Sequence, residues 1–234
     1  MKEITELMYA ARRFHLTRAS LCVQRLGYHK SRRKKGLSMN TEAHFFAIVS
    51  RMKYIERWAL MRNARPENLS EHALEVAMIA HALCVIGNVR YGRELDANHA
   101  AVMGVYHYAS EIITGDMPTP VKYRNETLRG AYKAVEREAE GELLSTLPKD
   151  LLPAFEEAFS AGGDAYLQGL VKAADKLSAY IKCMEEAASG NEEFKTAAAS
   201  TLAALDGMRV EYPEVGDFMD EFLPSYGKTL DELL

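Results

Sequence analysis

The chain has 234 residues, of which 48% are hydrophobic and 26% charged, and it carries a net charge of −4. This composition is typical of a globular protein with one large domain, or one domain with an arm. The chain contains no run of about 18 apolar residues and no N-terminal secretory pattern, so we expect neither a membrane span nor a signal peptide. The cysteines, Cys22, Cys84 and Cys183, fit a reducing cytoplasm better than a disulfide framework and have no zinc-finger spacing.

The charge is unevenly distributed. Residues 1–38 contain ten Lys or Arg and two acidic residues, a balance of +8, so residues 39–234 carry −12. A basic arm suits nucleic acid or an anionic surface. No stacking-aromatic pattern, helix-turn-helix or zinc motif accompanies it, so we expect a disordered or loosely helical tail and no nucleic-acid binding. A further hypothesis is that translation starts at Met39, since Lys35-Gly36 fits a purine-rich ribosome-binding stretch upstream of it.

The periodicity of apolar residues is helical nearly throughout. Strictly alternating segments joined by Asn-Gly or Asp-Gly turns are absent, so no hairpin is expected. The pattern predicts an all-α fold. An amphipathic arm is expected over residues 3–26, followed by helices near 41–54, 70–86, 96–114, 125–146, 150–159, 164–189, 192–208 and 214–222.

His72 lies in the first turn of the helix expected from Ser70, with Ser70 as its N-cap. It is in line with the apolar stripe of Val76, Ile79 and Leu83, so its imidazole is expected on the buried face. A hydrogen-bonded, half-buried histidine near a helix start is the simpler interpretation of such a residue taken alone.

The segment from Tyr106 to Pro120 contains a histidine, two carboxylates and a loop marked by prolines. In one continuous helix, His107 and Glu111 share a face because they are four residues apart. Asp116 follows where Thr114-Gly115 is expected to end that helix. The helix also places His107 in line with Ala100, Met103 and Gly104, so a second inward-facing histidine is predicted.

Asp175 lies on or beside the buried stripe of its predicted helix, four residues after Val171 and one after Ala174. A buried carboxylate is costly unless it is paired or bound to a cation. The alternative is an Asp at the edge of the stripe, paired with Lys172 and Lys176.

Taken together, these segments resemble the HD-domain metal-dependent phosphohydrolase superfamily, and most closely its bacterial 5′-deoxynucleotidase branch. The resemblance runs from about residue 40 to 226. It is carried by His44-Phe45-Phe46, by residues 57–63 and 67–72, by His107-Tyr108-Ala109-Ser110-Glu111 through residues 115–123, and by Lys172-Ala173-Ala174-Asp175. It implies a multi-helix HD-domain-like bundle over residues 39–234, commonly a homodimer. The implied reaction removes phosphate from deoxyribonucleoside 5′-monophosphates.

The resemblance also implies one divalent transition metal, held by His72, His107 and Asp175. Imidazole and carboxylate donors suit Co²⁺, Mn²⁺, Zn²⁺ or Cu²⁺ better than Mg²⁺. The family has an Asp after the second His, and Tyr108 stands in that position here. The phenol is longer than a carboxylate and has an ordinary pKa of about 10.

The remaining roles also follow from the resemblance. Glu111 is the implied acid/base residue, and Asp116 a second catalytic or substrate-contacting carboxylate. Arg57 is implied to orient the phosphate, for which a guanidinium fork is suited. Trp58 and the run Asp116-Met117-Pro118-Thr119 are implied to contact sugar and base.

Tyr108 leaves two functions open. One is a metal-dependent nucleotidase, impaired or not by the phenol, since three protein ligands are enough for many catalytic zinc sites. The other is a catalytically silent nucleotide-binding or regulatory protein on the same scaffold. Hydrolysis of nucleoside triphosphates or cyclic nucleotides is a more distant alternative.

Overall fold

The computed structural model describes residues 43–122, 124–159 and 163–234, and within these ranges it contains helices and no strand. The predicted all-α fold is confirmed. Its nearest approach to a sheet is one isolated bridge between Glu56 and Asn68. The expected amphipathic arm over residues 3–26, and the whole of the basic arm, lie outside the described residues, so those expectations stay predictions.

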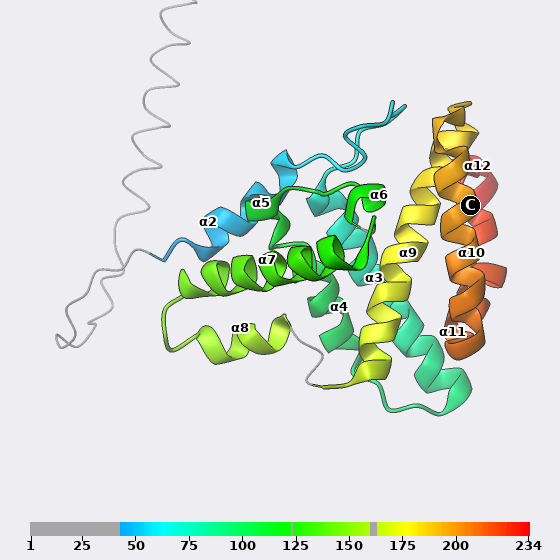
Figure 1. The fold of residues 1–234 in the computed structure, drawn as a ribbon. Coiled ribbons are helices and arrows are strands. Elements are labelled where there is room, and N and C mark those ends of the chain that lie inside the picture. The colour runs from blue at the N-terminus through cyan, green and yellow to red at the C-terminus, as the bar shows by residue number, and fades with distance from the viewer. Residues whose placement is uncertain (1–42, 123, 160–162) are drawn as a thin grey trace, which may run out of the picture. The chain divides into compact units, whose positions relative to one another are not determined.

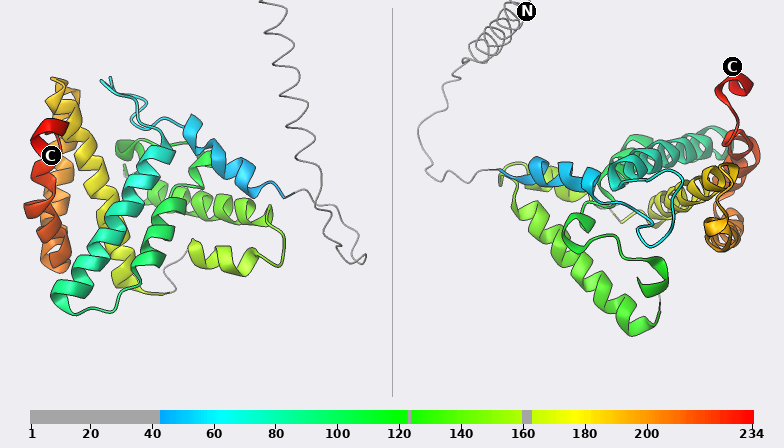
Figure 2. Two further views of the ribbon diagram at one scale, coloured as in Figure 1. Left: turned by 180° about the vertical axis from the view of Figure 1, so that it is seen from behind. Right: turned by 90° about the horizontal axis from the view of Figure 1, so that it is seen from above.

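Figure 1 shows the order of the elements. They are α2 (Phe45–Val49), η1 (Ser50–Tyr54), α3 (Leu69–Tyr91), α4 (Ala97–Tyr106), α5 (Glu111–Thr114), α6 (Thr119–Lys122), α7 (Glu126–Ser145), α8 (Leu152–Ala158), α9 (Ala165–Ala188), η2 (Glu192–Phe194), α10 (Lys195–Glu211), α11 (Pro213–Glu221), η3 (Leu223–Ser225) and α12 (Leu230–Leu233). Helices α10 and α11 lie along one side of α9, and α7 and α8 lie at the opposite end of the domain (Figures 1 and 2).

Helix α3 is longer at both ends than the sequence predicts. Its N-cap is Asn68, whose side chain accepts hydrogen bonds from the backbone of Ser70 and Glu71 in a capping box. Gly87 lies inside the helix rather than ending it, and a Cβ there would lie 2.7 Å from Oε1 of Glu214. The glycine therefore permits close packing, and Gly92, with φ of 63°, ends the helix.

The helix expected over residues 96–114 is interrupted. Helix α4 ends at Tyr106, a turn follows, and α5 starts at Glu111. In the turn, Ala109 N donates to Tyr106 O at 2.9 Å and Glu111 N to Tyr108 O at 3.0 Å, which are three-residue rather than four-residue bonds. His107 and Glu111 are therefore not on one continuous helical face, and that prediction was wrong.

The core is built on the inward face of α3, which packs against α4 and α9. The predicted stripe of Val76, Ile79 and Leu83 is buried there. By length and composition alone α3 would also suit a membrane. Its most apolar stretch of 18 residues has a mean hydropathy of 1.5, and 56% of that stretch is buried in the domain. A central core helix has the same character, so this is weak support for a span.

Candidate active site

Two long core helices and three connecting segments supply the predicted site residues. The first turn of α3 carries His72, and the middle of α9 carries Asp175. Tyr108 lies in the turn between α4 and α5, and Glu111 is the first residue of α5. Arg57 lies in the loop between η1 and α3, which is closed by a hydrogen bond from Arg57 N to Glu67 O at 2.9 Å.

The hydrogen bonds of His72 fix its tautomer. The imidazole is fully buried, and its Nδ1 lies 2.8 Å from Oγ of Ser178. That hydroxyl donates its single proton to Oε2 of Glu75 at 2.5 Å, so it accepts from Nδ1–H. Nε2 is therefore the nitrogen with the free lone pair.

That lone pair faces another acceptor. Nε2 of His72 lies 3.3 Å from Oδ1 of Asp175, and among the described residues it has no hydrogen-bond partner. Burial and the charge of Arg57 lower the pKa of His72 to about 4, so the imidazole is neutral at neutral pH. A neutral imidazole nitrogen and a carboxylate oxygen turned toward each other fit a shared divalent cation.

Asp175 already has partners at both oxygens. Oδ1 accepts a short hydrogen bond from the Tyr108 hydroxyl, and Oδ2 lies 3.2 Å from Nζ of Lys176. Burial alone would raise the pKa of Asp175, but the positive charges of Lys176 and Arg57 hold it well below its ordinary value. Burial and Asp175 raise the pKa of Tyr108 well above its usual range, so the phenol stays protonated and remains a donor.

His107 lies at the edge of this group, directly after the last residue of α4. The residue is exposed, yet burial of the imidazole lowers its pKa and the charge of Asp175 opposes that shift, so the inward direction of His107 stays a prediction. Its ring contacts that of Tyr108 at 4.7 Å between centroids, and the ring of His72 lies at the same distance on Tyr108. In the described part of the chain, no three His, Cys, Asp or Glu residues are gathered closely enough to hold a metal ion. Two of the three expected donors therefore fit a metal, and the third does not complete a preformed site.

Glu111 is a buried carboxyl group with an unusual pKa. It is 6% exposed, and within the described ranges its Oε2 makes no hydrogen bond. Burial and the charge of nearby Asp116 raise its pKa to about 8. It is therefore mostly protonated at neutral pH, which is the state that a general acid needs.

Arg57 and Trp58 are held by one carboxylate. Oε2 of Glu67 accepts from Nη1 of Arg57 at 2.8 Å and from Nε1 of Trp58 at 3.2 Å. Burial opposes the charge on Arg57, yet nearby carboxylates, Glu67 first among them, raise its pKa further. Trp58 has φ of 57°, a left-handed conformation that is rare for a bulky side chain. Such strain occurs often where a side chain has to be positioned for function.

The loop after α5 brings Asp116 near the same centre. Gly115, with φ of 73°, ends α5 and turns the chain. Asp116 contributes to the raised pKa of both Glu111 and Arg57, which places its charge within reach of both groups. Met117 and Pro118 are partly exposed, and Thr119 is exposed at the start of α6. Their predicted contacts to sugar and base remain predictions.

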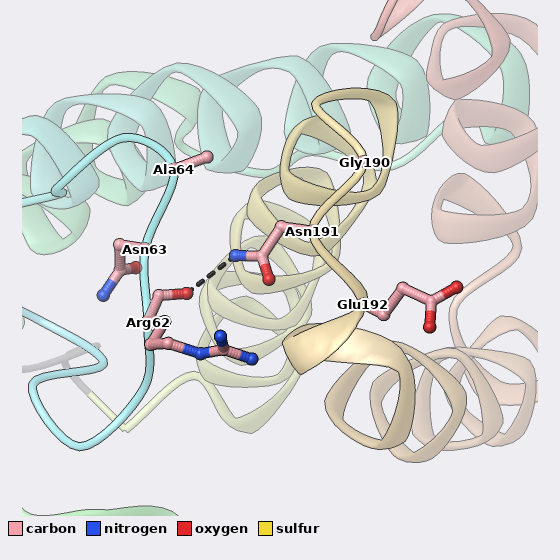
Figure 3. Close-up of a pocket in the computed structure, with 6 residues that line it drawn as sticks. All are labelled: Arg62, Asn63, Ala64, Gly190, Asn191 and Glu192. Carbon is pink, nitrogen blue, oxygen red and sulfur yellow. Dashed lines mark hydrogen bonds between the residues drawn. The ribbon is translucent and has the colours of Figure 1, made fainter.

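A pocket of about 420 Å³ lies elsewhere, between the loop after Trp58 and the C-terminal end of α9 (Figure 3). Nδ2 of Asn191 donates to Arg62 O at 2.7 Å beside it. Its lining contains none of the predicted site residues and consists of Arg62, Asn63, Ala64, Gly190, Asn191 and Glu192.

Ser178, Glu75 and the anchoring role of Glu67 were not predicted from the sequence. Ser178 is three residues after Asp175, and Glu75 is three residues after His72, so each shares a helical face with a predicted site residue. That spacing was the available signal. Only the packing of α3 on α9 shows that the two faces meet.

The fold is that of the HD-domain phosphohydrolases. A crystal structure of an HD-domain phosphohydrolase from Listeria innocua matches with a TM-score of 0.69 and 24% identity, covering 78% of this chain and 88% of that one. The cyanophage S-2L HD phosphohydrolase DatZ, bound to dA and one catalytic Zn²⁺ ion, matches with a TM-score of 0.52 and 20% identity, covering 82% and 99%.

Sequence comparison is more specific. The family profile described as "5'-deoxynucleotidase YfbR-like" matches residues 44–226. The 5′-deoxynucleotidase YfbR of Shigella dysenteriae is 46% identical over 200 residues, covering 82% of this chain and 96% of that protein. The 5′-deoxynucleotidase of Erwinia tasmaniensis is also 46% identical, over 195 residues, with the same coverage. The chain therefore belongs to the YfbR-like 5′-deoxynucleotidase family, as the resemblance in its motifs predicted.

Proposed function

We propose that this protein is a metal-dependent phosphohydrolase that removes phosphate from deoxyribonucleoside 5′-monophosphates. The observation that carries the proposal is the burial of both Arg57 and Glu111 in a chain of this family, where burial and Asp116 raise the pKa of Glu111 to about 8. The guanidinium suits a phosphate dianion, and the carboxylic acid suits a leaving alkoxide.

His72 and Asp175 are the donors that would hold a divalent transition metal, with His107 as the third. A neutral imidazole with its tautomer fixed through Ser178, and an ionised carboxylate, support this assignment. Co²⁺, Mn²⁺, Zn²⁺ and Cu²⁺ are the ions whose preferences match these donors. When bound, the metal supplies Lewis-acid polarisation of the phosphoryl group.

The residues of the chain divide the remaining work. Arg57 binds the phosphate oxygens and is kept in place by Glu67, which uses one of its N–H donors. A water molecule adds to phosphorus while the bond to the 5′ oxygen breaks, and protonated Glu111 donates its proton to that departing oxygen. The proton released by the attacking water restores the acid form of Glu111. Trp58 and residues 116–119 then contact sugar and base.

The test is phosphate release by the full chain from dAMP, dGMP and TMP with added Co²⁺ or Mn²⁺. Release is expected, with Arg57→Ala lowering kcat/KM by at least about 100-fold, because a buried charged partner of the phosphate is lost. Nucleotide binding without release, in a protein that takes up no metal, would instead establish the catalytically silent alternative.

We also propose a cytoplasmic homodimer. Its support is an apolar stripe on α3 that is exposed in the single chain, made of Leu74, Met78, Val85 and Val89. These residues lie within one narrow arc of the helix, which also contains exposed His81, and extend over roughly 22 Å. Exposed apolar stripes of this length are typical of protein interfaces.

A further inference from the structure

Tyr108 uses the oxygen that a metal would need. Its hydroxyl donates to Oδ1 of Asp175, and this is the oxygen that lies 3.3 Å from the free Nε2 of His72. A cation shared by that nitrogen and that oxygen needs a lone pair that the phenol now engages. The second oxygen, Oδ2, is engaged by Lys176.

The phenol ring is also firmly placed. It contacts the rings of His72 and His107 at 4.7 Å each, and the guanidinium carbon of Arg57 lies 5.8 Å from its centre. It packs against both hydrophobic clusters of the domain. A ring supported on several sides does not turn away without loss of packing, so its hydrogen bond to Asp175 is pre-organised.

We propose that Tyr108 is an internal competitor for the metal ligand Asp175, so that a divalent ion binds only as the phenol gives up Oδ1. The hydroxyl is thus a brake on metal occupancy and not a fourth ligand. The inference rests on the proposed function for the identity of the metal site, and it assigns to Tyr108 the control of metal affinity.

Three forms of the full-length protein test this: the wild type, Tyr108→Phe and Tyr108→Asp. Phenylalanine keeps the ring and removes the hydroxyl, so it separates competition from coordination. The probes are Mn²⁺ and Zn²⁺ alone, titrated calorimetrically into protein stripped of metal. Asp175→Asn is the site control, and circular dichroism with thermal unfolding shows whether each variant is folded.

The expected order of metal affinity is Tyr108→Asp above Tyr108→Phe above wild type. The gain from phenylalanine is on the order of tenfold, since one hydrogen bond to a charged acceptor no longer has to be broken. Asp175→Asn abolishes binding in all three backgrounds. No tyrosinate absorption band appears when the wild type binds metal, because the phenol is displaced and not ionised.

Weaker or unchanged binding by Tyr108→Phe would overturn the proposal, and a tyrosinate band would show the phenol to be a ligand. Absence of metal binding in all folded variants would overturn it as well. These readouts are independent of turnover. If the affinities follow the expected order and no deoxynucleotide releases phosphate, the proposed function fails and the role of Tyr108 stands.

Discussion

The raised pKa of Glu111 suits its proposed role as a general acid, and it also lowers the stability of the protein at high pH. Its pKa of about 8 in the folded protein lies above the ordinary value of 4.5. Between these two values the folded state binds the extra proton, so the free energy of unfolding falls as pH rises from about 4.5 to about 8. Below and above this pH range, Glu111 has the same protonation state in the folded and unfolded protein, so it no longer makes the free energy of unfolding depend on pH.

Glu111→Gln is therefore expected to remove this part of the pH dependence and to stabilise the protein at pH 9 by roughly 5 kcal/mol. It should also lower kcat by at least about 100-fold, since the amide has no acidic proton to donate. Urea unfolding across the pH range and steady-state kinetics measure the two effects. Asp116→Asn is the matched variant, and it should move the Glu111 transition to lower pH. An unchanged pH profile in Glu111→Gln would contradict the assignment.

Ser178 is expected to act on the metal only through His72. Ser178→Ala removes the acceptor that holds Nδ1–H, so the imidazole is free to place its proton on Nε2. Metal affinity should fall by about 10- to 100-fold, which is the usual effect of losing such a partner. The ¹⁵N shifts of His72 in the metal-free protein should show mixed tautomers. Ser200→Ala is the control, since that exposed hydroxyl bonds Ala197 O of its own helix. A single unchanged tautomer in Ser178→Ala would contradict this role.

Most helices could be predicted from the sequence. The prediction failed where contacts between residues distant in the chain determine the structure. The pattern over residues 125–146 and 164–189 matches α7 (Glu126–Ser145) and α9 (Ala165–Ala188) to within one residue at each end. Asn125 and Asp164 cap these helices, and such local signals are readable from sequence.

The turn at residues 107–110 was not readable in this way. The apolar spacing continues through it, so periodicity alone predicts one helix where the structure has α4 and α5. The burial of His72 was predicted correctly, because the apolar stripe in line with it is buried in the core. The Glu75–Ser178–His72 chain joins residues about a hundred positions apart, and no local pattern contains that pairing.

Helices α3 and α4 pack closely at Gly104, where the absence of a side chain matters. A Cβ on Gly104 would lie 2.7 Å from Cα of Ala77, where backbone meets backbone and neither can yield. Gly104→Ala should therefore destabilise the protein by about 1–3 kcal/mol. Gly141→Ala on α7 is the matched control, because nothing lies within 4 Å of its added Cβ. That variant should stabilise the fold by about 0.5–1 kcal/mol. Thermal unfolding measures the change in stability of both variants. A change of the same sign in both would contradict the packing explanation.

The outward face of α3 exposes several large apolar side chains, and nothing in the described part of the chain covers them. The helix carries apolar residues on its outward face as well, beside exposed His81, and an apolar helix face is normally covered. Its inner face supports His72, while its outer face leaves Leu74 and Met78 59% and 58% exposed. On α4, Val102 and Val105 are also exposed. The same rigid helix would then hold the site on one side and a second copy on the other, so that dimer formation stabilises the helix that carries His72.

Met78→Glu is expected to convert the dimer into a monomer, because a carboxylate would have to be buried in an apolar interface without a partner. Val210→Glu is the control, since Val210 on α10 is 86% exposed and lies outside the stripe. Sedimentation equilibrium should give a dimer mass for the wild type and Val210→Glu, and a monomer mass for Met78→Glu. The monomer should also unfold at a lower temperature, in proportion to the lost association free energy. A wild type that stays monomeric at micromolar concentration, or a Met78→Glu variant that stays dimeric, would show that α3 is not the interface.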